Sequence, residues 1–568
     1  MHAFHAPVPA ARHRSIPLVA VLCSMVFATG CASRTSADTL RNVAEGRYDQ
    51  AQALTDAEYG GSFTPEGVPH PDIVEDDKLS LLWSMESGQI QKLAGDLGRA
   101  RSALELASIK VEALRERVRT GAILRDVSTF IVNDTLSEYE GAGFEHIQVD
   151  LQRSLIELMR GQIAEGMWEP VGASLAAYAA QAEPQAVAQH YSNAVSYARR
   201  MTQKELAEVD YAAKEKLLSS QRYTDDPFAR VYAAALMDAV PERAADDRQY
   251  ADAMLKGAVG TYAEHLKLLG GQRILRYEVP RLPGVAQTLA VRNGLAYDPV
   301  GFTEWAARTG IDSSTAAARP AGQGSLLVLN EADFIARIEP LTVNAVVATV
   351  GLGTYEDSRG KRHQSRIGSL IFWATGPGSE TVETWAAIPL PAALTEPLTT
   401  AGAPQLWRFQ IPVHAPDAPN PASATVAVTP VDGGDTTIVT TEVIADLDAF
   451  ARANLKDEQV YTAVKTLTRV AVKQLAVWLT AQSLKKDNEL LAFLTQAVGS
   501  AAMSATEWAD LRSAALLPNR VEAGLIDLPP GRYRVAVGGR DLGVVTIKPD
   551  RTTVLPARTF PAPIIVTD

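Results

Sequence analysis

The spacing of apolar residues changes near residue 325, and this change limits what the chain can fold into. Over residues 39–275 alanine, leucine, glutamate and arginine dominate, proline is sparse, and the pattern is helical. After residue 325 apolar residues alternate with polar ones in short runs rich in β-branched and aromatic residues, which indicates strands. The sequence therefore predicts a multidomain α+β protein in which a helical half precedes a β-rich half.

One segment of the helical half has the spacing of a helical repeat. Within residues 81–114 small and apolar residues occupy positions typical of tetratricopeptide repeats (TPR), which are helix–turn–helix units of about 34 residues. With the nearby aromatic residue, the set is Trp83, Gly88, Gly95, Ala100 and Leu104. We predict a TPR-like domain over residues 39–275 and expect this set to form an interaction site. An ordinary helical bundle is the alternative.

Residues 276–324 are rich in proline and glycine, which indicates a linker or a loop-rich junction. The β-rich half follows in two parts, residues 325–445 and 516–568, and its regular short strands favour a β-sandwich-like domain. Residues 432–435 (DGGD) predict a hairpin turn. Between the two parts, residues 446–515 carry a long apolar stripe at helical spacing. We expect this insertion to be a long helix packed on the sheet.

The N-terminus predicts export. Residues 1–14 include Arg12 and Arg14 and no acidic residue, and residues 15–30 are almost wholly apolar or small. A basic stretch, a short apolar stretch and small residues before a break are typical of a secretory signal peptide, here residues 1–30. The run is short for a bilayer span, which needs about 20 apolar residues.

The small residues before Cys31 resemble the bacterial lipobox, in which the peptidase cuts before a cysteine that carries diacylglycerol. This resemblance implies cleavage between Gly30 and Cys31, lipidation of Cys31, and a short tether over residues 31–38. A plain signal peptide and a short anchor helix are the alternatives to this lipoprotein signal. Ala32 is not aspartate, which by the bacterial sorting rule favours the outer membrane over the inner one. We expect the anchored protein to face the periplasm. The chain after Cys31 contains no cysteine, so it has no disulfide and no thiolate metal site.

Charge and composition exclude several function classes. Loss of Arg12 and Arg14 with the signal takes the net charge from −12 to about −14 at pH 7. Nucleic-acid binding needs basic patches, so we expect no nucleic-acid partner. An acidic protein is also not attracted to an anionic membrane by charge, which leaves the lipid as the membrane contact.

The sequence contains no persuasive catalytic motif. There is no HExxH, no phosphate-binding GK[ST] and no GxSxG sequence. No two histidines after Cys31 have metal-ligand spacing; they are His70, His146, His190, His265, His363 and His414. We therefore expect no catalytic residues, no metal site and no cofactor, and a protein that is not an enzyme.

Several motifs resemble a family of uncharacterised Gram-negative outer-membrane lipoproteins with TPR-like N-terminal halves and β-rich C-terminal halves. In the first half the motif is YEG at 139–141 followed by Phe144 and Glu145. In the second half it is ADLRS at 509–513, then Leu517-Pro518 and LPPGRY at 528–533. The resemblance covers most of the chain, although Ala514 stands where the family usually has tryptophan. It implies a peptidoglycan or envelope context, with penicillin-binding proteins or their lipoprotein activators as partners.

Two functions are consistent with these patterns and stand as hypotheses. The first is a non-enzymatic, lipid-anchored scaffold of the cell envelope, whose helical hairpins offer a groove to protein partners. The alternative is a protein that binds or hydrolyses peptidoglycan fragments at a site assembled from scattered carboxylates. A cleft lined by two converging carboxylates would favour the second hypothesis, and a broad apolar groove would favour the first.

Overall fold

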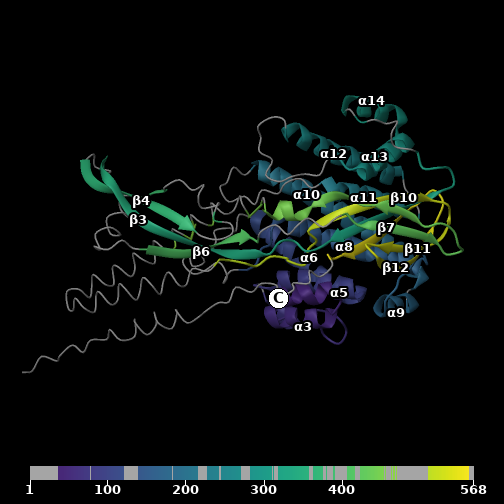
Figure 1. Ribbon diagram of the computed structural model, residues 1–568, viewed down its shortest axis with the longest axis horizontal. Coiled ribbons are helices and arrows are strands. Elements are labelled where there is room, and N and C mark those ends of the chain that lie inside the picture. Colours follow the sequence, from purple (N-terminus) through teal and green to yellow (C-terminus); the bar gives the residue numbers. More distant parts are fainter. Residues whose placement is uncertain are drawn as a thin grey trace, which may run out of the picture.

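The computed structural model describes residues 36–561 except 77, 120–137, 182, 215–226, 242–244, 270–281, 310, 312–317, 357–361, 375–378, 380–387, 391–405, 416–422, 453, 456–461, 463–464, 467–468 and 470–508. The predicted signal peptide, the cleavage site at Gly30 and the lipid-bearing Cys31 lie outside the described residues. So does most of the predicted helical insertion. The described part is mixed α+β, with helices and several antiparallel strand pairs, as the sequence predicts (Figure 1).

The first described helices belong to residues 37–164. They are α2 (Ala37–Ala44), α3 (Tyr48–Tyr59), α4 (Pro71–Glu75), α5 (Ser80–Ala94), α6 (Leu97–Arg119) and α8 (Gly143–Ala164). The turn between α5 and α6 depends on Gly95, whose φ of 84° is left-handed. Glycine adopts this conformation at little cost because it has no Cβ. Helix α8 is buried along nearly its whole length, so it forms the centre of the helical layer.

The later helices extend beyond the predicted end of the helical half. They are α9 (Ala173–Gln181), the 3₁₀ helix η2 (Pro184–Ala186), α10 (Val187–Lys214), α11 (Pro227–Ala239), α12 (Ala245–Leu269), α13 (Gly284–Tyr297) and α14 (Pro299–Thr309).

Helices α13 and α14 correct the prediction of a linker over residues 276–324. Pro283 is the N-cap of α13, and Pro299 is the first residue of α14, a position where a missing backbone N–H costs nothing. Gly294 lets the two helices approach, since a Cβ there would lie 2.0 Å from Cδ2 of Phe302. The prolines and glycines therefore mark helix starts and a helix contact in this stretch.

The strands that the structure describes form three sheets. The central sheet has the order β13 (Thr552–Thr559), β2 (Gly324–Ala332), β10 (Arg520–Leu528), β9 (Glu442–Asp446), with β13 parallel to β2. The outer sheet has the order β1 (Trp168–Glu169), β12 (Arg540–Ile547), β11 (Gly531–Val537), β7 (Thr425–Pro430), β8 (Thr437–Thr440). The arm sheet has the order β5 (Ile388–Leu390), β4 (Arg362–Ala374), β3 (Ile338–Glu356), β6 (Leu406–His414). The predicted turn at residues 432–435 is confirmed, because β7 pairs with β8 across it.

The central sheet is buried on both faces. Along β2, Leu326 and Val328 belong to one hydrophobic cluster with Val428 and Val535 of the outer sheet. The alternate residue Leu327 belongs instead to the cluster built mainly from helices. Residues 326–329 of β2 form a continuous apolar run because both faces of the strand are covered.

The helical and β-rich halves are joined through this core. Strand β1 lies within the helical half of the sequence, yet Trp168 pairs with Val545 at the edge of the outer sheet. The hydroxyl of Tyr262 on α12 donates to the Ile444 carbonyl of β9 at 2.7 Å. The β-rich half consequently packs directly on the helices.

The arm sheet extends away from the rest of the molecule (Figure 1). Strand β3 has 19 residues, a length of about 60 Å. It pairs with β6 over Ile338–Val346 and with β4 over Val343–Glu356. Beyond Val346, the free edge of β3 pairs with no other strand among those the structure describes.

Candidate functional site

The predicted interaction set lies in the interior. Trp83, Ala100 and Leu104 are all at most 1% exposed. A Cβ on Gly88 would lie 2.6 Å from Cγ of Leu104, so the glycine allows α5 and α6 to touch. Gly95 makes the turn between them. The spacing correctly identified a close helix contact, but these side chains pack against their own chain and offer no surface to a partner.

Trp83 also has a polar role in the interior. Its Nε1 donates to Oδ1 of Asp56 at 2.8 Å, and its ring lies 5.1 Å from that of Phe63. Burial raises the pKa of Asp56, and the hydrogen bonds from Trp83 and Gln52 oppose that rise. The tryptophan therefore fixes α5 against the preceding helices.

A buried polar cluster joins the helices to the central sheet. We call it the Lys92 cluster; it consists of Lys92 on α5, Gln152 on α8, Glu331 on β2 and Arg558 on β13. Nζ of Lys92 lies 2.7 Å from Oε2 of Glu331, and Nε2 of Gln152 donates to Oε1 of Glu331 at 2.6 Å. Nη1 of Arg558 lies 3.6 Å from the same carboxylate, at Oε2. Two cations thus share one buried carboxylate.

The electrostatics of the cluster favour an ionised glutamate. Burial raises the pKa of Glu331, but the attraction of Lys92 and Arg558 outweighs it, so the pKa lies below its usual value. Burial lowers the pKa of Lys92, and Glu331 offsets only part of that effect. Burial also lowers the pKa of Arg558, although its nearest carboxylates favour the charged form.

Three buried members of the cluster, Lys92, Glu331 and Arg558, form the floor of a cleft of about 100 Å³. The apolar lining residues are Leu93, Met159, Trp168, Val171, Leu175, Leu542, Pro556 and Ala557. The polar ones are Lys92, Glu331, Arg540, Asp541 and Arg558. The cleft therefore combines apolar walls from both halves of the chain with a charged floor.

The two carboxylates of the cleft bear on the hydrolase hypothesis. Lys92 and Gln152 each hold one oxygen of Glu331. The hydrogen bond from Arg534 lowers the pKa of Asp541. A glycosidase needs one carboxyl group with a raised pKa as its general acid. These two carboxylates supply fixed charge and do not provide that acid.

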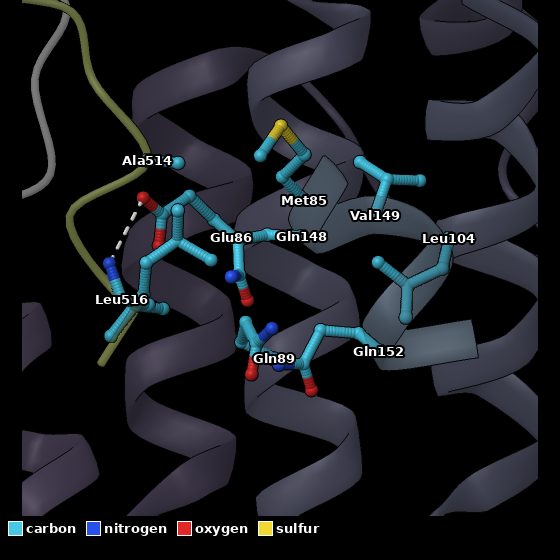
Figure 2. A pocket seen from close by; sticks show the side chains of 10 residues that line it. Met85, Glu86, Gln89, Leu104, Gln148, Val149, Gln152, Ala514 and Leu516 are labelled. Atoms are coloured by element: carbon cyan, nitrogen blue, oxygen red, sulfur yellow. Dashed lines mark hydrogen bonds between the residues drawn. The ribbon is translucent and has the colours of Figure 1, made fainter. Parts of the chain in front are cut away.

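A second, internal cavity of about 10 Å³ lies between α5, α8 and the segment that precedes β10 (Figure 2). Glu86, Gln89, Gln148 and Gln152 surround it, and Glu86 accepts a hydrogen bond from the Leu516 backbone at 3.3 Å. This volume suits about one water molecule. Since Gln152 also binds Glu331, the polar lining of the cavity continues into the Lys92 cluster.

Two distant motifs meet beside this cavity. The Tyr139 hydroxyl donates to Oε2 of Glu145 at 2.6 Å, and the Ala514 backbone N–H donates to Oε1 at 2.9 Å. The guanidinium of Arg512 lies 5.7 Å from the centre of the Tyr139 ring. Burial raises the pKa of Glu145. The YEG motif and the ADLRS motif thus form one contact that holds α8 to the β-rich half.

The far end of α8 is tied to the turn between β12 and β13 by two further ion pairs. Glu165 accepts hydrogen bonds from Arg551 at 2.6 and 2.9 Å, from Lys548 at 2.6 Å and from the Tyr191 hydroxyl at 2.7 Å. Burial raises the pKa of Glu165, but these partners outweigh it and lower the pKa to about 2. The carboxylate is therefore a fixed structural anion at neutral pH.

The described ranges lack two further features. Within them, no three His, Cys, Asp or Glu side chains are grouped so as to hold a metal ion. In the same ranges, no helix is both long enough and apolar enough to cross a membrane.

Comparisons with protein-family models, curated proteins and solved structures found no match to this chain. The resemblance to outer-membrane lipoproteins therefore stays a prediction.

Sequence reasoning missed the Lys92 cluster. Lys92 and Gln152 stand among many polar residues of predicted helices, and Arg558 lies in the last strand. The one available signal was Glu331, a charged residue that closely follows the apolar run at residues 326–329 of a strand. A charge in a strand buried on both faces requires a buried partner, which the pattern alone does not identify.

Proposed function

We propose that this protein is a lipid-anchored, non-enzymatic scaffold of the cell envelope that holds protein partners through its arm sheet. The observation that carries the proposal is the edge of β3 from residue 347 onward, which pairs with none of the described strands on the side away from β4, on an arm that extends from the body. An extended, unpaired edge can accept a strand from another protein, which supplies backbone hydrogen bonds. Beyond the pairing with β5 and β6, only β3 and β4 continue outward among the described strands. A two-stranded ribbon is only marginally stable in water, so a partner would stabilise this outer part of the arm.

The same arm exposes large apolar side chains. Ile371 and Trp373 on β4 are 49% and 42% exposed. They are two residues apart in one strand and therefore point to the same face of the sheet. Exposed tryptophan is enriched among the residues that carry binding energy at interfaces. The arm thus offers both an edge and an apolar face.

Other parts of the proposal rest on the sequence. Lipidation of Cys31 and the sorting rule support anchoring in the outer membrane, facing the periplasm. The motif resemblance supports penicillin-binding proteins or their activators as the partners. We also propose that the helical layer is TPR-like, supported by the close α5–α6 contact, and that the central and outer sheets are β-sandwich-like, supported by their shared hydrophobic cluster.

The test is quantitative capture from cross-linked envelope membranes. The variant is Ile371→Ser with Trp373→Ser, and the matched control is Ile438→Ser, which alters an apolar residue on β8 that is 66% exposed. We expect the double variant to recover at least about tenfold less penicillin-binding protein or activator, because truncating a hot-spot residue costs about 2 kcal/mol or more. Equal recovery by both variants, or recovery of none of these partners by the unaltered protein, would contradict the proposal.

A further inference from the structure

The cleft above the Lys92 cluster has the features of a binding site for a small amphipathic anion. We propose that it binds a ligand with one carboxylate or phosphate head and a short apolar body. This inference does not depend on the scaffold proposal, because it uses residues of the body and none of the arm.

The floor of the cleft contains a buried cation with unused hydrogen-bonding capacity. Arg558 is 3% exposed, and its Nη2 donates to the backbone carbonyls of Asp333 at 2.6 Å and Leu516 at 3.0 Å. Its Nε makes no hydrogen bond among the described residues, and its Nη1 has only the 3.6 Å contact with Oε2 of Glu331. A buried guanidinium N–H without a partner costs free energy, and a ligand oxyanion would remove that cost.

The charge on the floor also favours an anion. One oxygen of Glu331 pairs with Lys92 and the other accepts a hydrogen bond from Gln152, so the closest approach of Arg558 to this carboxylate is 3.6 Å. The other carboxylate of the cleft, Asp541, is paired with Arg534, while Arg540 adds a third cation to the lining. The guanidinium of Arg558 is fixed in position, since it lies 5.4 and 5.5 Å from the ring centres of Phe334 and Phe560.

The walls define the rest of the ligand. Met159, Trp168 and Leu542 are buried, while Leu175 is partly buried and packs against the same hydrophobic cluster. Val171, 44% exposed, lies at the rim. A cavity of about 150 Å³ holds benzene, so a cleft of about 100 Å³ suits an apolar body of about six carbons or fewer. The walls would bind such a body by excluding water from it.

The experiment is titration calorimetry with hexanoate, hexyl phosphate and hexanol. The protein is the full chain from residue 32, which lacks only the predicted signal and lipid-bearing cysteine. We expect at least one of the two anions to bind, and hexanol to bind at least tenfold more weakly. Binding of hexanoate alone assigns a carboxylate head, and binding of hexyl phosphate alone assigns a phosphate head.

Two variants locate the site. Arg558→Leu removes the proposed partner of the anion, and Val171→Asp places a negative charge at the rim without altering the buried floor. Val68→Asp is the matched control, because Val68 is 47% exposed and does not line the cleft. We expect Val171→Asp to weaken anion binding at least tenfold and Val68→Asp to leave it unchanged. The proposal is overturned if neither anion binds at millimolar concentration, if hexanol binds as tightly, or if Val171→Asp has no effect.

Discussion

Replacing Gly88 by alanine tests whether the α5–α6 contact is as close as the structure indicates. A Cβ at this position would lie 2.6 Å from Cγ and 2.8 Å from Cδ2 of Leu104, well inside van der Waals contact. Leu104 is 1% exposed, so its side chain has little room to move away. Forcing an extra methyl group into a packed core costs about 1–3 kcal/mol.

The helix propensity of alanine acts in the opposite direction. Alanine in a helix interior is about 1 kcal/mol better than glycine, so the net cost of Gly88→Ala is about 0–2 kcal/mol. The matched control is Gly260→Ala in α12, where a new Cβ would meet no atom within 4 Å. Gly260→Ala therefore gains the helix propensity of alanine and has no steric cost. The difference in free energy of unfolding between the two variants should therefore be about 1–3 kcal/mol, with Gly88→Ala the less stable.

Denaturant unfolding followed by tryptophan fluorescence measures this difference, since Trp83 is buried on the same helix. Leu104→Ala provides a second check. Truncating a buried leucine costs about 2–5 kcal/mol, but in the double variant the new methyl group occupies part of the space that the leucine vacates. The two substitutions should compensate each other. Equal stability of Gly88→Ala and Gly260→Ala, or additive losses in the double variant, would show that α5 and α6 are not in close contact.

Two further predictions concern buried charge. Glu331→Gln leaves Lys92 and Arg558 buried without their carboxylate and should lower the free energy of unfolding by about 3–5 kcal/mol. Adding Lys92→Met should restore part of the lost stability. A loss below about 1 kcal/mol for Glu331→Gln would refute the Lys92 cluster. Glu165 has a pKa of about 2 in the folded protein against an ordinary 4.5, so its ion pairs stabilise the fold above about pH 4.5 and lose effect as pH falls toward 2. Denaturation of Glu165→Gln should therefore show a larger deficit at pH 7 than at pH 3, and an equal deficit at both would count against the assignment.

Local patterns predicted much of the secondary structure and little of the long-range assembly. The helices up to residue 269 and the strands after residue 324 follow from periodicity, and the turn at 432–435 follows from its glycines. The parallel pairing of β2 with β13 and the pairing of β1 with β12 join segments more than 200 residues apart. No local pattern encodes such partners. The same limit explains the error over residues 284–309, where Pro283 and Pro299 are equally compatible with a loop and with the start of a helix.

In the candidate site too, local contacts could be predicted from the sequence and long-range contacts could not. Gly88 and Leu104 lie within one helical hairpin, so their spacing was enough to predict their contact. Lys92 and Glu331 are 239 residues apart. Lys92 alone resembles an ordinary surface charge of a helix, and the position of Glu331 in an apolar strand does not identify its partner. Only the fold, by burying β2 on both faces and placing α5 against its end, turns them into an ion pair.

Photo-cross-linking in living cells tests the central claim most directly. A photo-reactive amino acid replaces Trp373 on the arm, or Ile438 on the outer sheet as control, in chains with and without Cys31→Ser. The scaffold account predicts that position 373 cross-links to a penicillin-binding protein or an activator lipoprotein, that position 438 does not, and that loss of Cys31 reduces the yield. Cross-linking equal at the two positions, or absent at position 373 in the lipid-anchored chain, would contradict it.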